Sequence, residues 1–335
     1  MEESVPRHEF WIDRGGTFTD CIYRNPATGE LRALKVLSSD EAPIEGIRAL
    51  LGLESDAALP RCEVRMGTTL ATNALLERQG YPCALLTNEG LADLVRIGDQ
   101  TRPELFALAI ERPAALPELI LETEARANAD GSRIRAHDAE SLRARLRAAR
   151  NAGARSLAVS LIHAYRDGAL ERDAARIAEG LGFEQVSLSH EVSNELGLLG
   201  RTDTTVANAY LTPLLTNYMK KLERLLGPDR LRMMQSNGGL VDARAFVGRH
   251  AVLSGPAAGV VATAAVAAEL GLSEVIGFDM GGTSTDVSRY AGTLNRVFET
   301  EIAGIRVRAP MIELHTVAAG GGSICALEAK RMTVG

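Results

Sequence analysis

Two eight-residue segments of nearly the same sequence are the strongest candidates for chemistry in this chain. Asp13 to Asp20 reads D-R-G-G-T-F-T-D and Asp279 to Asp286 reads D-M-G-G-T-S-T-D, so six of the eight positions match in one register. Each begins at the end of an apolar stretch. The pattern predicts a strand that places an aspartate at its end, followed by a tight glycine turn. Either segment alone is typical of a plain β-hairpin. The matched pair instead indicates a duplicated domain whose two turns serve one ligand.

The residue types of both segments suit a phosphate-binding turn. Glycines let the backbone approach a ligand and adopt φ values that other residues avoid, and successive N–H groups form an anion-binding concavity. Threonine hydroxyls add donors, and aspartates hold Mg²⁺, partly through water. We expect Asp13 and Asp279 to be the catalytic carboxylates, as metal ligands or as groups that position the nucleophile. The expected phosphate ligands are Gly15, Gly16, Thr17, Thr19, Gly281, Gly282, Thr283 and Thr285.

A third glycine cluster lies near the end of the chain and consists of Gly320, Gly321, Gly322 and Ser323. Bare backbone of this kind can lie against the base or ribose of a nucleotide, and the alternative is a flexible loop. No G-x-x-x-x-G-K-[ST] segment occurs, which excludes a P-loop.

The elements that position these segments follow from apolar patterns, turns and caps. An antiparallel meander is expected over Phe10 to Asp13, Phe18 to Tyr23 and Leu31 to Leu37. Further along, alternating strands and helices are typical of an α/β fold, with Asp138 as the N-cap of a helix that ends near Asn151. The other expected helices are Ala42 to Leu51, Thr69 to Arg78 and Leu170 to Leu181. The other expected strands are Cys62 to Met66, Cys83 to Thr87, Ser156 to Ile162, Val186 to Ser189, Leu231 to Met234 and Val275 to Asp279.

Two helical segments raise questions. The stretch from Thr204 to Leu226 contains Pro213, which we expect to kink or restart the helix. Ala251 to Ala268 carries no charge and approaches the length of a membrane span. Its Ala, Gly, Ser and Thr content gives little gain on insertion into lipid, so we expect a buried helix over Ala257 to Leu270 and no membrane association.

Composition narrows the class of protein. The chain of 335 residues has a formal net charge of −6 and a pI near 5.7, which argues against a nucleic-acid partner. Four cysteines form no C-x-x-C pair, and the first ten residues lack the apolar core of a secretory signal. A cytoplasmic location is the simplest expectation.

The three clusters, in this order, resemble the two phosphate motifs and the adenosine motif of the actin-like ATPase superfamily. Longer motifs over most of the chain resemble the hydantoinase A and 5-oxoprolinase family, with the ATP-dependent 5-oxoprolinases the most similar members. These motifs are Ile12 to Asp20, Arg65 to Arg78, Leu253 to Val260, Gly277 to Tyr290 and Thr316 to Ser323.

This resemblance implies an α/β fold of actin-like, RNase H-like duplicated halves: a first region at 1–202 and a second at 203–335 that stops short of the family pattern. It implies ATP and Mg²⁺ as cofactors and opening of 5-oxoproline to glutamate through a phosphorylated amide. The alternatives are an N-methylhydantoinase, a subunit of an ATP-dependent ketone carboxylase, or a nucleotide-binding fragment without turnover. The implied partners are a small cyclic amide and either the missing C-terminal region or a hydantoinase B-like subunit.

Some roles stay open at the level of sequence. Asp20 and Asp286 either anchor the ligand-binding residues or cap their turns. Arg14 either meets a substrate carboxylate or forms a surface ion pair. Asn73 either lines the cleft or lies on a helix surface.

Overall fold

The computed structural model describes residues 8–102, 105–109, 113–228, 230–282, 284–328 and 331–334. Thr283, one of the expected phosphate ligands, lies outside the described residues. Strands and helices alternate along most of the chain, and two sheets contain parallel strand pairs, which confirms the predicted α/β class.

The first sheet carries the first repeat and has six strands within the described ranges. Its order is β12 (Leu240–Asp242), β11 (Leu231–Met234), β4 (Cys62–Thr68), β1 (His8–Arg14), β2 (Phe18–Arg24) and β3 (Leu31–Leu37). Strands β1, β2 and β3 form the predicted antiparallel meander, while β4 runs parallel to β1 on its other side. Strands β11 and β12 complete this sheet although they follow position 202 in the sequence, and the division at 202 stays a proposal.

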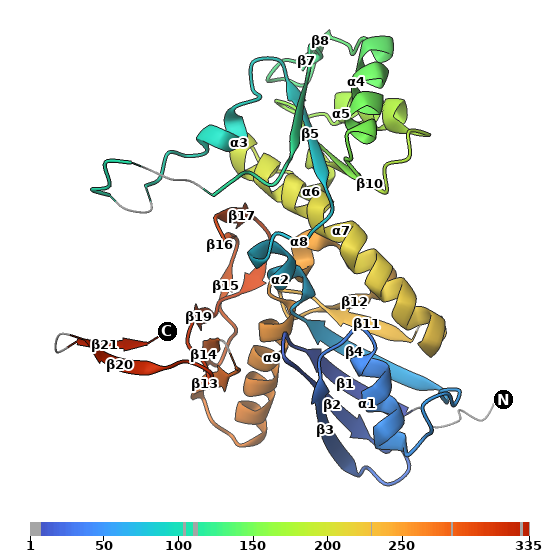
Figure 1. Cartoon of the computed structure of the whole chain (residues 1–335), viewed down its shortest axis with the longest axis vertical. Helices are drawn as coiled ribbons and strands as arrows, with labels where there is room; N and C mark the ends of the chain where they lie inside the picture. The colour runs from blue at the N-terminus through green and yellow to red at the C-terminus, as the bar shows by residue number, and fades with distance from the viewer. Residues whose placement is uncertain are drawn as a thin grey trace.

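The second sheet is parallel and lies at the opposite end of the molecule (Figure 1). Its order is β10 (Gln185–Leu188), β9 (Ser156–Val159), β5 (Cys83–Asn88) and β6 (Leu119–Thr123). Helices α4 (Ala139–Asn151) and α5 (Ala169–Ala178) bury their apolar sides in its core. The carboxylate of Asp138 accepts bonds from the amides of Glu140 and Ser141, which confirms the predicted N-cap.

The third sheet carries the second repeat and has three strands among the described residues: β13 (Glu274–Met280), β14 (Thr285–Ala291) and β19 (His315–Val317). In the part of the chain that the structure describes, four two-stranded ribbons accompany the sheets. They are β7 (Arg126–Ala127) with β8 (Arg133–Arg135), β15 (Arg296–Val297) with β18 (Met311–Ile312), β16 (Thr300–Ile302) with β17 (Ile305–Val307), and β20 (Cys325–Glu328) with β21 (Arg331–Val334). Figure 1 shows the β20–β21 ribbon projecting away from the third sheet.

The other helical segments are α1 (Ala42–Leu51), α2 (Leu70–Leu76), α3 (Leu94–Ile97), α6 (Ser189–Val192), α7 (Leu198–Leu226), η1 (Ala243–Ala245), α8 (Gly248–Ala251) and α9 (Ser254–Glu269). Helix α1 packs so closely on the first sheet that a Cβ atom on Gly46 would lie 2.4 Å from Cys21 Sγ.

Helix α7 runs continuously past Pro213, so of the two expected outcomes, a kink or a restart, the restart was wrong. Proline removes one intrahelical hydrogen bond, worth little against the packing of a long helix. Pro213 and most of α7 are buried, and α7 contacts strands of both the first and the second sheet. Figure 1 shows α7 extending from one sheet to the other.

Helix α9 corrects another expectation. Its first half is buried at Ser254, Gly255, Ala257 and Val260, but beyond Val260 only Ala267 is buried, and Val266 and the C-cap Leu270 are exposed. The uncharged composition was therefore not a sign of complete burial. Among the described residues, no helix is long and apolar enough to cross a membrane.

Candidate functional site

The two repeated segments form hairpins of the same geometry. Asp13 pairs with Asp20 across β1 and β2, and Asp279 pairs with Asp286 across β13 and β14. The turns close alike, because the amide of Gly15 donates to Phe18 O at 3.0 Å and that of Gly281 to Ser284 O at 2.9 Å. The sequence repeat is thus a structural repeat.

The two turns face each other. A Cβ atom on Gly282 would lie 3.8 Å from Thr17 Oγ1, which places the tip of the second turn beside a side chain of the first. Thr17 and Gly16 are exposed, so their polar groups are open to a ligand. This is the arrangement expected of two turns that share one anion.

Helix α9 runs beside both aspartates. A Cβ atom on Gly255 would lie 3.3 Å from Asp13 Oδ1, and one on Gly259 would lie 3.9 Å from Asp279 Oδ2. Because these glycines are four residues apart, they occupy one face of the helix. Their missing side chains leave room for one carboxylate from each hairpin.

The carboxylate of Asp13 lies in an unusual environment. Its Oδ1 is buried and has no hydrogen-bond partner in the structure. Burial raises the pKa of Asp13 to about 6, and the negative charges of Asp20 and Asp279 add to this effect. A buried, unpaired carboxylate oxygen beside like charges is a place where a cation would be stabilised.

A Mg²⁺ ion fits these residues. It usually keeps several waters and needs only one or two protein carboxylates. Among the described residues, no group of three or more His, Cys, Asp or Glu side chains is arranged to hold a metal. A mostly hydrated ion on Asp13, with Asp279 nearby, is compatible with that donor set.

The third glycine cluster is fixed to the second turn. The amide of Gly321 donates to Gly281 O at 2.9 Å, and that of Gly322 donates to Gly282 O at 2.8 Å. The hydroxyl of Ser323 accepts a bond from the amide of Gly320 at 3.0 Å. The alternative of a loop without fixed partners therefore does not describe this segment.

The turn glycines serve close approach and not unusual backbone angles. None of Gly15, Gly16, Gly281, Gly282 or the third cluster has a positive φ, contrary to the expectation from sequence. Space is the constraint instead: a Cβ atom on Gly15 would lie 2.8 Å from Phe18 O, and one on Gly320 would lie 2.6 Å from Gly281 O.

Two of the expected threonine ligands face the protein. Thr19 is fully buried, its hydroxyl lies 3.0 Å from Ser38 Oγ, and Ser38 in turn donates to Gly15 O at 2.7 Å. The equivalent Thr285 donates to Ala319 O at 2.6 Å. Both hydroxyls hold the turns in place, and direct phosphate contacts from them stay predictions.

The second aspartate of each hairpin has a protein partner. Asp20 forms an ion pair with Lys35 at 2.6 Å, and Asp286 accepts a bond from Thr316 Oγ1 at 2.6 Å. Burial raises the pKa of Asp286, and the nearby charge of Asp279 acts in the same direction. The contacts favour an anchoring role over direct ligation.

The structure bears differently on the alternatives that the sequence left open for Arg14 and for Asn73. The guanidinium of Arg14 pairs with Asp40 at 3.2 Å and lies over the ring of Tyr218 at 4.8 Å, so the ion-pair alternative is present. A Cβ atom on Gly16 would lie 3.3 Å from Asn73 Nδ2, which places Asn73 against the first turn.

Other residues of this site had little signal in the sequence. Ser254 accepts a bond from the amide of Thr68 at 3.3 Å and donates to Met234 O at 2.7 Å, which ties α9 to the first sheet. Ser38 supports the first turn from a connecting loop. Only the small residues at the start of α9 hinted at such a close approach.

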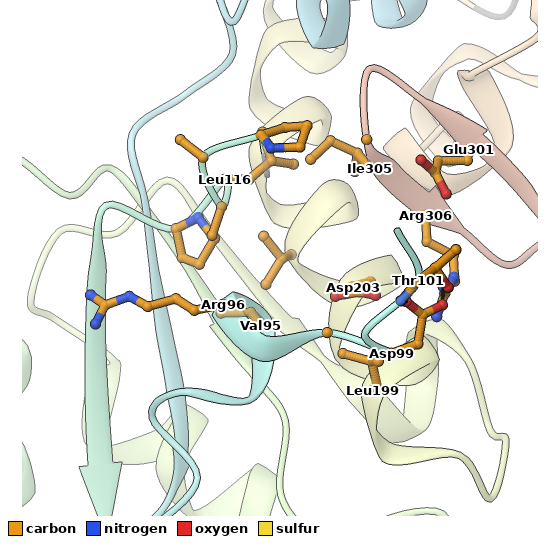
Figure 2. Close-up of a pocket in the computed structure, with 17 residues that line it drawn as sticks. Val95, Arg96, Asp99, Thr101, Leu116, Leu199, Asp203, Glu301, Ile305 and Arg306 are labelled. Atoms are coloured by element: carbon orange, nitrogen blue, oxygen red, sulfur yellow. Dashed lines mark hydrogen bonds and ion pairs between the residues drawn. The ribbon is translucent and has the colours of Figure 1, made fainter. Parts of the chain in front are cut away.

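A cavity of about 200 Å³ lies elsewhere, between the loops around α3, helix α7 and the β16–β17 ribbon (Figure 2). Arg306 forms ion pairs with Asp99 and Glu299 at its edge. The described residues that line it include no member of the three glycine clusters. The cavity is therefore distinct from the paired turns.

Comparison with known proteins agrees with the motifs. The family model described as the hydantoinase/oxoprolinase N-terminal region matches residues 9–182, and the hydantoinase/oxoprolinase model matches residues 201–335. The chain is 40% identical to a 5-oxoprolinase of Saccharomyces cerevisiae over 93% of its own length, but it spans only 28% of that protein.

Two solved structures share the fold. An ATP-dependent caprolactamase from Pseudomonas jessenii superposes with a TM-score of 0.81 at 30% identity, over 96% of this chain and 49% of that one. A nucleotide-free acetone carboxylase superposes with a TM-score of 0.82 at 22% identity, over 99% of this chain and 51% of that one. From its motifs, its paired hairpins and both family models, the chain belongs to the hydantoinase/oxoprolinase family.

Proposed function

We propose that this chain is the nucleotide-binding core of an ATP-dependent 5-oxoprolinase. The observation that carries the proposal is the meeting of two hairpin turns of identical register, with Thr17 beside Gly282 and the third glycine cluster bonded to the second turn. Phosphates would lie between the turns, and the adenosine would lie along Gly320, Gly321 and Gly322.

Positioning and charge neutralisation supply most of the catalysis in phosphoryl transfer. The exposed turn amides would hold the phosphates, while Asp13 and Asp279 would hold Mg²⁺ through its bound waters. The ion would neutralise charge on the phosphates and offset the repulsion among the four hairpin carboxylates. Thr19, Ser38 and Thr285 would keep the turns in their binding geometry.

The proposed reaction begins with an amide, which resists water because its carbonyl is stabilised by resonance. The amide oxygen attacks the γ-phosphorus of ATP, the bond to the β-phosphate oxygen breaks, and ADP leaves. Water then adds to the activated carbon, and cleavage of the carbon–nitrogen bond opens the ring to an acyl phosphate. A second water releases phosphate and glutamate.

The identity to a 5-oxoprolinase supports this substrate, and the likeness to an ATP-dependent caprolactamase supports the wider class of cyclic amides. Because the chain spans about a quarter to a half of these relatives, we propose that turnover needs the region beyond the matched part, or a hydantoinase B-like subunit.

The test is ADP formation by this chain combined with the remaining region of the yeast relative. Parallel reactions contain 5-oxoproline, caprolactam, N-methylhydantoin, or acetone with bicarbonate. We expect stimulation by 5-oxoproline, and its loss in Asp279→Asn. Stimulation by a different compound would replace the substrate assignment, and failure to bind Mg-ATP would overturn the nucleotide site itself.

A further inference from the structure

A hollow of about 430 Å³ lies where the C-terminal half of α7 meets the start of α2 and the loop between β3 and α1. We call it the α7 hollow. The described residues that line it include no member of the three glycine clusters. Leu70 and Leu214 supply an apolar wall, and the other lining residues are polar or charged. Small-molecule sites typically combine several hundred Å³ of space, apolar walls and a few polar groups.

Positive charge prevails in the α7 hollow. Arg224 comes one helical turn after Lys220 and Lys221, so the three cations lie on one face of α7. Asp40 is the single acidic residue of the described lining, and it forms ion pairs with Lys221 at 2.8 Å and with Arg14 at 3.2 Å. Among the described residues, Lys220 and Arg224 have no hydrogen-bond or ion-pair partner. Two positive charges of the lining therefore lack a counter-charge.

The Tyr81 hydroxyl adds an uncharged donor to the lining. Asn217 Nδ2 donates to Tyr81 Oη at 2.6 Å, so the hydroxyl oxygen is the acceptor in that bond. A phenol can accept one hydrogen bond and donate another. No further described residue bonds this hydroxyl. The Tyr81 proton is therefore available to an acceptor in the hollow.

The hydroxyl of Tyr218 is a buried donor without an acceptor. Tyr218 lines the hollow and is 4% exposed, and its Oη has no hydrogen-bond partner among the described residues. Burial raises the pKa of Tyr218 against the opposing effect of the Arg14 charge, so the hydroxyl keeps its proton. A buried donor left unpaired costs stability. A negatively charged oxygen in the hollow would remove that cost.

We propose that the α7 hollow binds a small organic dianion, either a phosphate monoester or a dicarboxylate, at a site separate from the paired turns. Lys220 and Arg224 balance its two negative charges, and the planar guanidinium of Arg224 suits a bidentate contact with phosphate or carboxylate. The hydroxyls of Tyr81 and Tyr218 donate to its oxygens, and the apolar wall contacts its carbon atoms. The inference does not depend on the proposed reaction.

The test is isothermal titration of this chain at low ionic strength with glycerol phosphate, succinate and the monoanion acetate. We expect at least one dianion to bind saturably and about 10-fold more tightly than acetate, because its second charge meets the second unpaired cation. Tighter binding of glycerol phosphate would assign the phosphate class, and tighter binding of succinate the dicarboxylate class. No saturable binding, or equal binding of acetate, would overturn the proposal.

Mg-ATP separates this site from the paired turns. Repeating the titration with excess Mg-ATP should change the affinity for the dianion by less than about 2-fold, as for two sites with little coupling. Loss of dianion binding in proportion to the Mg-ATP concentration, as in direct competition, would place the dianion at the paired turns and overturn the proposal. If the chain fails to bind Mg-ATP, the proposed function fails, whereas the binding of the dianion is still measured.

Three variants locate the bound dianion. Arg224→Gln and Tyr218→Phe should each weaken its binding by about 10-fold, because each removes a hydrogen bond to a charged group. Arg147→Gln removes the same charge from an exposed position on α4, at the opposite end of the molecule (Figure 1), and should bind as the wild type does. Tyr218→Phe should be at least as stable as the wild type without ligand, since the hydroxyl makes no bond.

Thermal unfolding measures the stability of each variant. Equal losses of affinity in Arg224→Gln and Arg147→Gln would indicate a general effect of charge and would overturn the proposed site. Unchanged affinity in both Arg224→Gln and Tyr218→Phe would do the same.

Discussion

The backbone of Gly320 lies so close to that of Gly281 that a Cβ atom on Gly320 would sit 2.6 Å from the Gly281 carbonyl oxygen. The same atom on the neighbouring Gly321 would lie 3.8 Å from that oxygen, which is an ordinary contact. Gly320 therefore has no room for a side chain, whereas Gly321 has room for a methyl group.

This difference gives a matched pair of variants. Gly320→Ala should separate the third cluster from the second turn and weaken ATP binding by about 10-fold or more, equivalent to about 1.4 kcal/mol. Gly321→Ala should bind within about 2-fold of the wild type. Isothermal titration with Mg-ATP measures both, and equal affinities would contradict the proposed packing constraint.

The raised pKa of Asp13 makes stability depend on pH. Its folded pKa of about 6 exceeds the value near 3.9 of an unfolded aspartate, so the folded state binds more protons between these values. The stability of the ligand-free chain should therefore fall as the pH rises from about 4 to about 6.

Asp13→Asn should remove most of this slope and raise the ligand-free stability at pH 7 by up to about 3 kcal/mol. It should also abolish Mg-ATP binding. Urea titrations from pH 4 to 7, with the exposed Asp56→Asn as control, measure the slope. A variant with an unchanged slope would refute the assignment to Asp13.

Arg14 tests whether the first turn contacts the substrate. Its guanidinium is engaged by Asp40 and Tyr218, so Arg14→Ala should lower stability by about 1–2 kcal/mol through lost pairing and stacking. In the assembled enzyme that we propose, the KM for the proposed substrate 5-oxoproline should stay within about 3-fold. Thermal unfolding and steady-state kinetics measure the two effects, and a KM raised 100-fold would instead indicate a substrate contact.

The buried carboxylate of Glu171 ties α5 to the segments that follow β9 and β10. Its oxygens accept bonds from the amide of Leu161 at 2.8 Å, from Ser189 Oγ at 2.6 Å and from His190 Nδ1 at 2.7 Å. Glu171→Ala should cost about 3–5 kcal/mol, because it leaves buried donors unpaired. The exposed Glu191→Ala should cost less than about 0.5 kcal/mol. Urea denaturation compares them, and a small loss for Glu171→Ala would disagree with this account.

Local patterns predicted the elements that carry the hairpins. Strand β3 and helix α1 begin and end at the predicted residues. A turn with Pro26 and Gly29 comes before β3, and α1 has a clear apolar face. The helix that Asp138 caps was predicted equally well, because an N-cap side chain binds backbone amides within three residues of itself. The repeat also indicated correctly that the two hairpins are copies.

Long-range contacts were beyond those patterns. The continuity of α7 past Pro213 comes from burial against two sheets, which no local propensity contains. The inward direction of Thr19 depends on Ser38, and that of Thr285 depends on Ala319. The residue type alone does not distinguish a threonine hydroxyl that binds backbone from one that binds phosphate.

The position of β11 and β12 in the first sheet has a consequence for synthesis. During translation, β1 to β4 leave the ribosome long before Leu231, the first residue of β11, which pairs with β4. The nascent chain therefore cannot form the native pairing of β4 with β11 until the whole second sheet has emerged. A protease or chaperone that recognises open strand edges would meet the protein in this interval.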